Sequence, residues 1–241
     1  MIVRGNTKLG PGIWTWSIPA AKTCPGASPV CLSCCYGFRG RYRMANTRDA
    51  HNRNYLLSLR DDFASRMSRE IFDNAVAVLR IHAVGDFYSP EYVEKWRRIV
   101  SRNRRTTFYC YTRSWAMPEI KAPLLSLTSL PNFRLWLSWD MSMPVPPRVN
   151  GVRRCYLSTS DEDLPNRGCA DLIFRENQKT KLKRGKRGEL VCPYDNGVTA
   201  TTCSHCKLCW QDNVPPAKKI IKRESKNVGS SSRGARTTQR A

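Results

Sequence analysis

The feature that most constrains the fold of this chain is the alternation of strand-like runs and amphipathic helical segments in its first 140 residues. The strand-like runs are short, apolar and rich in β-branched and aromatic residues, which is typical of β-strands. They occupy residues 12–19, 75–82, 106–112 and 133–138. We therefore expect four strands, with a helix between each pair of successive strands.

The expected helices differ in how clearly the sequence marks them. An apolar stripe with spacings of three and four residues predicts one long amphipathic helix between Asn54 and Asn74. A second helix should begin after Ser89, because a serine N-cap, a proline in the first turn and an early acidic residue follow one another there. Residues 118–130 form a weaker helical region.

This order of elements predicts an α/β protein. Strands that alternate with helices form right-handed βαβ units around a parallel sheet. We expect an incomplete parallel (βα) barrel with an N-terminal cluster loop at residues 1–140, a basic, Cys-rich metal-binding region at 141–214 and a basic disordered tail at 215–241. Ligands of such folds bind at the carboxyl ends of the strands. The candidate catalytic residues at those ends are His82, Asp86, Arg113 and Asp140.

Eight of the eleven cysteines fall into two groups. The N-terminal group is Cys24, Cys31, Cys34 and Cys35, and the C-terminal group is Cys192, Cys203, Cys206 and Cys209. No apolar run reaches the roughly 18 residues that span a bilayer, and the N-terminus lacks a secretory signal, so we expect a cytoplasmic protein without a membrane partner. Grouped cysteines in such a protein indicate metal binding more than disulfides.

The spacing within the C-terminal group favours iron over zinc. Three closely spaced cysteines with a remote Cys-Pro, here Cys192-Pro193, are the ligand pattern of ferredoxin-type clusters, whereas structural zinc usually takes two separate Cys-x-x-Cys pairs. In the N-terminal group, either Cys34 or Cys35 can be the third ligand beside Cys24 and Cys31. Three thiolates would leave one iron of a [4Fe–4S] cluster open. We expect one or two clusters, with zinc as the alternative.

The charge predicts a polyanionic partner. The chain has 41 Lys and Arg against 19 Asp and Glu, a net charge of +22, and residues 215–241 account for only +7 of it. Such a charge attracts nucleic acid, DNA or RNA, ahead of an acidic host protein. The candidate nucleic-acid contacts are Lys179, Lys181, Lys183, Arg184, Lys186, Arg187, Lys218, Lys219, Lys222 and Arg223.

A cysteine loop after the first strand and an acidic turn after the second resemble the radical S-adenosylmethionine superfamily. The turn Gly85-Asp86-Phe87 is similar to the Gly-Gly-Glu turn of that superfamily, although the spacing Cys24-x6-Cys31 is longer than its C-x3-C. The resemblance implies a partial barrel and possible binding of S-adenosylmethionine, with Gly85 and Asp86 near its amino group.

A longer set of residues resembles the phage and plasmid family called gene product 88. The residues are Thr23-Cys24-Pro25, Cys31, Cys35-Tyr36, Arg80-Ile81-His82, Gly85-Asp86-Phe87, Trp96, Tyr111-Thr112-Arg113-Ser114 and Cys203-x2-Cys206-x2-Cys209-Trp210. This resemblance implies that Cys35 rather than Cys34 is the ligand. It also implies a gene of a mobile element, whose product would act in the host cytoplasm.

The expected function is that of an iron–sulfur protein of a phage or other mobile element that binds nucleic acid through its basic surface. The first alternative is a radical S-adenosylmethionine-type enzyme that modifies a nucleic acid or a host protein. The second is a zinc-stapled binding module. The sequence alone does not decide whether the chain is an enzyme.

Overall fold

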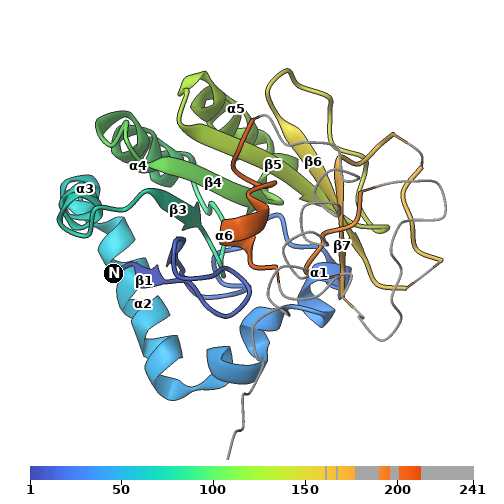
Figure 1. Cartoon of the computed structure of the whole chain (residues 1–241), viewed down its shortest axis with the longest axis horizontal. Coiled ribbons are helices and arrows are strands. Elements are labelled where there is room, and N and C mark those ends of the chain that lie inside the picture. The colour runs from blue at the N-terminus through green and yellow to red at the C-terminus, as the bar shows by residue number, and fades with distance from the viewer. Residues whose placement is uncertain (161, 167, 177–189, 196–200, 213–241) are drawn as a thin grey trace, which may run out of the picture.

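A seven-stranded sheet forms the centre of the computed structural model, which describes residues 1–160, 162–166, 168–176, 190–195 and 201–212 (Figure 1). The strands are β1 (Val3–Arg4), β2 (Trp14–Trp16), β3 (Val78–Ile81), β4 (Thr107–Thr112), β5 (Phe133–Trp139), β6 (Arg153–Ser158) and β7 (Leu172–Arg175). They lie in chain order; β1 is antiparallel to β2, and all other neighbours are parallel. The expected α/β class and parallel sheet are confirmed, and the described strands do not close into a barrel.

The helices are α1 (Pro29–Ser33), α2 (Ala45–Leu59), α3 (Phe63–Asp73), α4 (Pro90–Arg102), α5 (Pro118–Ser126) and α6 (Cys203–Cys206). Short 3-10 turns add η1 (Tyr36–Phe38), η2 (Gly40–Arg43), η3 (Ser114–Ala116) and η4 (Leu127–Ser129). Figure 1 shows α3, α4 and α5 side by side along one side of the sheet, with α6 on the other. In the part of the chain that the structure describes, no helix is long and apolar enough to cross a membrane.

Helix α4 forms as its sequence predicts. The hydroxyl of Ser89 accepts a hydrogen bond from the Tyr92 backbone N–H at 3.2 Å, and Pro90 occupies the first turn. Such a cap satisfies one of the N–H groups that a helix leaves unpaired at its start. The inward stripe packs in the main core with side chains of α3, β3 and β5; its residues are Tyr92, Val93, Trp96, Ile99 and Val100.

The single helix predicted between Asn54 and Asn74 is wrong. The chain leaves helical geometry after Leu59 and begins a new helix at Phe63. Leu56 and Leu59, which the stripe places inside, are 63% and 49% exposed. The buried side of α2 is polar instead, so hydrophobic periodicity cannot reveal it.

Two polar side chains hold α2 against the sheet. The Asn54 amide donates to the Ser17 carbonyl oxygen at 2.9 Å, and the Ser58 hydroxyl lies 2.8 Å from that of Tyr88. These hydrogen bonds add to the contacts that the partly buried Tyr55 and Leu57 make with the main core.

The sheet continues beyond residue 140 through β6 and β7, which the sequence pattern did not predict. Because side chains alternate along a strand, each strand divides its residues between two faces. One face packs under α3–α5 in the main core, and the other carries residues such as Tyr109, Trp136, Cys155 and Leu172. This second face is covered by residues 5–13 and by the C-terminal cysteine segments at 190–195 and 201–212.

Candidate functional site

The loops at the carboxyl ends of β3 and β4 are joined by Asp86. Its buried carboxylate accepts hydrogen bonds from the backbone N–H groups of Arg113 at 2.8 Å, Phe87 at 2.8 Å and Ser114 at 3.3 Å. Burial raises the pKa of Asp86 above its ordinary value, although these hydrogen bonds oppose the shift. This carboxylate therefore fixes two strand-end loops relative to each other. Asp86 is followed along the same edge by a second buried carboxylate.

That second carboxylate, Asp140 at the end of β5, pairs with Arg113 at the end of β4. The Arg113 guanidinium donates to Asp140 Oδ2 at 2.6 Å, and both side chains are buried. Burial alone raises the pKa of Asp140, but hydrogen bonds from Ser142 and Ser28, with the Arg113 charge, hold it below its ordinary value. Asp140 is thus a carboxylate and Arg113 is already paired, so their charges neutralise each other inside the fold.

The N-terminal cysteine loop docks onto this network. Ser28 donates its hydroxyl proton to Asp140 and accepts the Cys31 backbone N–H at 3.0 Å, so one side chain caps α1 and ties it to β5. A Cβ on Gly26 would overlap the Arg113 carbonyl, which shows how closely the loop backbone approaches β4. The loops that the sequence places at one edge of the sheet therefore do lie together.

Within this loop, Cys24, Cys31 and Cys35 interact with one another electrostatically. Burial, followed by the nearby Asp86 charge, raises the pKa of Cys24 to about 12. The Cys34 thiol instead points back into α1, where it donates to the Val30 carbonyl oxygen at 3.1 Å. Cys34 also interacts electrostatically with Cys31, so what distinguishes it from the three cysteines that the family resemblance selects is its hydrogen bond within α1.

His82 and Gly85 have conformational roles in the structure. His82 lies in the helix-covered core, where its Nε2 is 2.9 Å from the Tyr92 hydroxyl and its ring meets Phe87 edge-on at 4.7 Å. Burial, with the Arg80 charge, lowers the pKa of His82 to about 3, so the ring is neutral. Gly85 adopts φ +87°, and a Cβ there would overlap Ile18. No proton-transfer partner approaches His82 from the cysteine loop in the described residues.

The C-terminal cysteines lie on the second face of the sheet. A parallel bridge between Ile173 and Val191 and a 2.8 Å bond from the Cys192 N–H to the Ile173 carbonyl place Cys192 beside β7. The Cys203 N–H donates to the Lys8 carbonyl, and the Trp136 indole donates to the Cys209 carbonyl at 2.8 Å. Segments far apart in sequence thus bring this group together.

These thiols interact with each other and with two cations. The electrostatic neighbours of Cys209 are Cys192, Cys203 and Cys206. Burial raises the pKa of Cys192 to about 12 and also raises that of Cys203, while the Lys8 charge lowers both. Arg80 acts on Cys203 in the same direction as Lys8. Lys8 is itself paired with Asp195 at 2.7 Å, and the Asp195 charge raises the pKa of Cys192, so Arg80 is the one of these two cations without an acidic partner in the described ranges.

Arg80 is the residue of this region that sequence reasoning missed. It projects from β3 onto the second face, donates to the Tyr36 hydroxyl at 3.1 Å and lies 5.2 Å above the Tyr111 ring. Across the described ranges it forms no ion pair with an acidic side chain. The sequence feature that could have pointed to Arg80 is its position as a charged residue inside an otherwise apolar strand.

The structure leaves two predicted features open. As the side chains stand, no three His, Cys, Asp or Glu residues in the described ranges are arranged to hold a metal ion. The sulfurs of either group would have to draw closer to share one metal ion.

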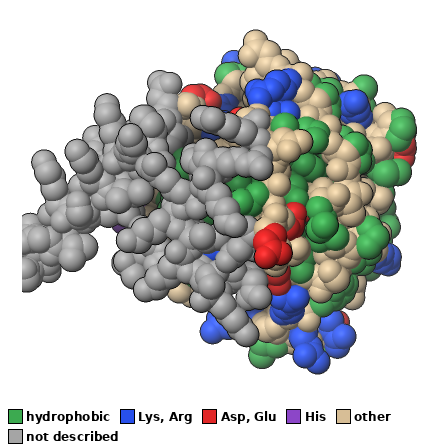
Figure 2. Space-filling model, turned by 90° about the vertical axis from the view of Figure 1, so that its right-hand side faces the viewer, with side chains coloured by type: hydrophobic (Ala, Val, Ile, Leu, Met, Phe, Trp, Pro, Cys, Tyr) green, Lys and Arg blue, Asp and Glu red, His purple; other side chains and the backbone are tan. Residues whose placement is uncertain are grey.

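The predicted nucleic-acid contacts at 179–187 and 218–223, and the tail at 215–241, lie outside the described residues. Figure 2 shows that the β7 side carries Lys and Arg side chains around an acidic group, so this side is not uniformly basic.

These features define an α/β protein with an open, mostly parallel sheet, one cysteine group at the strand ends and a second on the face opposite the helices. The family model described as Gene product 88 matches residues 1–212, and the chain belongs to this family. The "Gene 88 protein" of Mycobacterium phage L5 is 30% identical over 204 residues, covering 78% of this chain and 77% of the relative. The protein of the same name from Mycobacterium phage D29 is 30% identical over 205 residues, covering 78% of each.

No solved structure matches this chain. The comparisons confirm the resemblance to gene product 88 and give no support to the resemblance to radical S-adenosylmethionine enzymes.

Proposed function

We propose that this chain is an iron–sulfur protein of a phage or related mobile element that binds nucleic acid through its basic surface in the host cytoplasm. The observation that carries the proposal is the gathering of the C-terminal cysteines on a buried face beside Lys8 and Arg80. The relatives named above are phage proteins, which supports the origin. The ligand set proposed is Cys192, Cys203, Cys206 and Cys209 at the second face, and Cys24, Cys31 and Cys35 at the strand ends.

The environment of the C-terminal thiols suits a negatively charged cluster. Without metal, burial keeps these thiols protonated, and metal binding replaces their protons. Four thiolates on one cluster leave net negative charge in a site walled by Tyr111 and Trp136. Arg80 would supply compensating positive charge, and Lys8 would add to it in part, because Lys8 is shared with Asp195. When bound, such a cluster would supply either electron transfer or a structural cross-link.

The proposed nucleic-acid partner rests on charge. After subtraction of the tail, the first 214 residues still carry +15. Counterion release from a polyanion then provides binding free energy that falls as salt rises. An acidic protein would also be attracted, so binding must be measured against nucleic acid directly.

A radical S-adenosylmethionine-type enzyme is the second candidate, and one observation favours it. Cys24, Cys31 and Cys35 form a group of three at the carboxyl ends of parallel strands, beside the buried Asp86. Three ligands would leave one iron open to a substrate or cofactor. Under this proposal, the reduced protein would supply one electron to S-adenosylmethionine and the nucleic-acid or protein substrate would supply one hydrogen atom, so that the products are methionine and 5′-deoxyadenosine. An unchanged paramagnetic resonance spectrum on addition of S-adenosylmethionine would remove this candidate.

Metal analysis tests the main proposal. Protein prepared without oxygen and with iron supplied should contain iron and acid-labile sulfide. Cys203→Ser should lose the iron and sulfide bound by the C-terminal cysteines, and Cys35→Ser should lose those bound by the N-terminal cysteines. Cys34→Ser and Cys169→Ser are matched controls, because Cys34 is not in the proposed ligand set and its thiol donates to the Val30 carbonyl, and Cys169 belongs to neither group. Stoichiometric zinc without sulfide would favour the zinc-stapled module. Protein without bound metal would refute the iron–sulfur protein, the radical enzyme and the zinc module alike.

A further inference from the structure

The segment that follows the N-terminal cysteines carries an unusual concentration of positive charge. Residues 36–60 contain six arginines and a single acidic residue, Asp49. Of these arginines, Arg39 pairs with Glu176 and Arg60 with Asp62. The remaining four are exposed and form no ion pair in the ranges that the structure describes; they are Arg41, Arg43, Arg48 and Arg53, here called the arginine surface.

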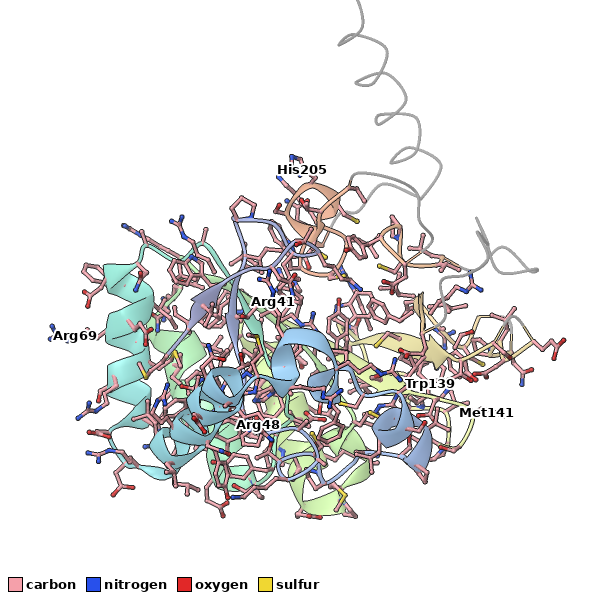
Figure 3. All side chains as sticks on the ribbon, turned by 90° about the horizontal axis from the view of Figure 1, so that it is seen from below. Arg41, Arg48, Arg69, Trp139, Met141 and His205 are labelled. Atoms are coloured by element: carbon pink, nitrogen blue, oxygen red, sulfur yellow. The ribbon has the colours of Figure 1, made fainter. Side chains whose placement is uncertain are left out.

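The arginine surface belongs to one folded unit. Tyr42, between Arg41 and Arg43, packs on the ring of Tyr36 at 5.7 Å and on that of His51 at 5.9 Å. This contact joins η1, η2 and α2, and it turns the side chains on either side of Tyr42 toward solvent. Figure 3 labels Arg41 and Arg48 on these adjoining elements, well separated from Arg69 on α3.

Two exposed aromatic rings border the arginine surface. Tyr36 and Phe38 on η1 are 46% and 51% exposed, although rings of this size are usually buried. The Tyr36 hydroxyl donates to the Ala83 carbonyl and accepts from Arg80, so the ring is held in place with part of it in solvent. Fixed rings beside arginines are the combination on which unpaired bases stack while the backbone phosphates contact cations.

Several other exposed arginines lie beside acidic residues. On α4, Arg97 and Arg98 are paired with Glu94. Phe72 on α3 is exposed, but residues 61–73 carry four acidic residues against two arginines. Repulsion of phosphate by those acids makes the α3 surface a poor site for a polyanion.

We propose that the arginine surface, with Tyr36 and Phe38, binds single-stranded nucleic acid and leads the strand past the N-terminal cysteine group. The inference deepens the proposed nucleic-acid function and rests on it. The adjacency is covalent and spatial, because η1 begins directly after Cys35 and a Cβ on Gly37 would lie 3.3 Å from the Cys35 sulfur. Four arginine–phosphate contacts give affinity without sequence preference, and the rings select unpaired bases over a duplex.

Fluorescence anisotropy on the full-length protein tests this proposal with three probes: oligo(dT), oligo(rU) and a duplex of equal length. The quadruple variant R41Q/R43Q/R48Q/R53Q should bind the single strands at least about tenfold more weakly, with a salt slope smaller by up to about three, since each phosphate contact contributes about 0.7. The matched control R69Q/R102Q/R104Q/R105Q removes the same charge from exposed positions on α3 and around the end of α4. It should retain most of the affinity.

Phe38→Ala separates stacking from charge. It should weaken single-strand binding about fivefold or more and leave duplex binding unchanged, because stacking on one base contributes about 1–3 kcal/mol. Equal losses in the two quadruple variants, or a preference for the duplex, would overturn the inference while the proposed nucleic-acid function stands. Wild-type protein that binds none of the probes at low salt would overturn that function as well.

Discussion

His82 lies in the aromatic core between β3 and α4 with a backbone φ of +62°, a conformation that few residues other than glycine adopt. Its Nε2 is bonded to the Tyr92 hydroxyl, and its buried Nδ1 has no partner. A second proton on this ring would place an uncompensated charge among Phe87, Tyr92 and Trp96. His82 is therefore a residue whose protonation opposes folding.

This burial predicts a pH dependence of stability. The pKa of His82 is about 3 in the folded chain against 6.5 for an unperturbed histidine, so between these values the unfolded chain binds more protons. The free energy of unfolding should then fall as pH falls below about 6.5, by up to about 1.4 kcal/mol per pH unit from this group. Urea titrations from pH 7 to pH 4 measure it.

His82→Asn should flatten that pH profile, because asparagine tolerates positive φ and carries no titrating group. His205→Asn is the matched control, since His205 is exposed on α6 and projects outward in Figure 3. Parallel profiles for the wild type and His82→Asn would show that other groups set the pH dependence.

At the same scale, the sequence identified the strand-end residues better than the second-face residues. Arg113 and Asp140 could be placed together because each follows a recognisable strand of a parallel sheet. Arg80 could not, because its place inside an apolar run says nothing of which tyrosines surround it. The exposed aromatic residues of η1 were equally hidden, since exposure depends on what the rest of the chain covers.

At the scale of the elements, helix α6 is held in place by hydrogen bonds to the loop of residues 5–13. The Cys203 and Ser204 N–H groups donate to the Lys8 and Leu9 carbonyls, so the loop backbone positions the first C-terminal cysteine of α6. Gly10 faces this helix with φ +81°, and a Cβ there would overlap Ser204. Gly12 lies in the same loop, yet its Cβ would lie 3.6 Å from Ser204, an ordinary contact.

Gly10→Ala should therefore destabilise the chain by at least about 1–2 kcal/mol, because alanine resists positive φ and displaces α6. Gly12→Ala should stay within about 0.5 kcal/mol of the wild type, as substitutions without steric conflict usually do. Chemical denaturation of both variants gives the comparison. Equal stabilities would show that α6 does not depend on this close approach.

The elements also show where sequence patterns succeed and fail. Helix α4 was predictable because its cap, proline and apolar stripe agree with one another. The break between α2 and α3 was not, because the buried side of α2 is formed by Asn54 and Ser58. Strand β6 begins with Arg153 and Arg154, which mask its strand pattern, and β7 is only four residues long.

In the molecule as a whole, the C-terminal cysteine segments connect parts that the helices do not reach. They contact loop 5–13 through Cys203, β5 through Trp136 and the β7 edge through Val191. Arg153 adds a 2.8 Å bond to the Leu208 carbonyl. A metal that drew the four thiols together would therefore cross-link both edges and the middle of the sheet.

Metal binding at these cysteines should consequently raise the stability of the entire chain. A ligand that binds only the folded state stabilises it according to its affinity, and structural metals are bound tightly. Since 1 kcal/mol shifts the melting temperature of a domain of this size by roughly 2–4 °C, anaerobic chelation of iron should lower it by about 10 °C or more. Differential scanning calorimetry of loaded and chelated protein measures the shift. Cys203→Ser should lose most of this shift, because only the N-terminal cysteines would still hold iron in it, whereas Cys169→Ser, outside both groups, should behave like the wild type. Equal melting temperatures with and without iron would mean that the hydrogen bonds to Lys8, Ile173 and Trp136 hold the second face together without a metal.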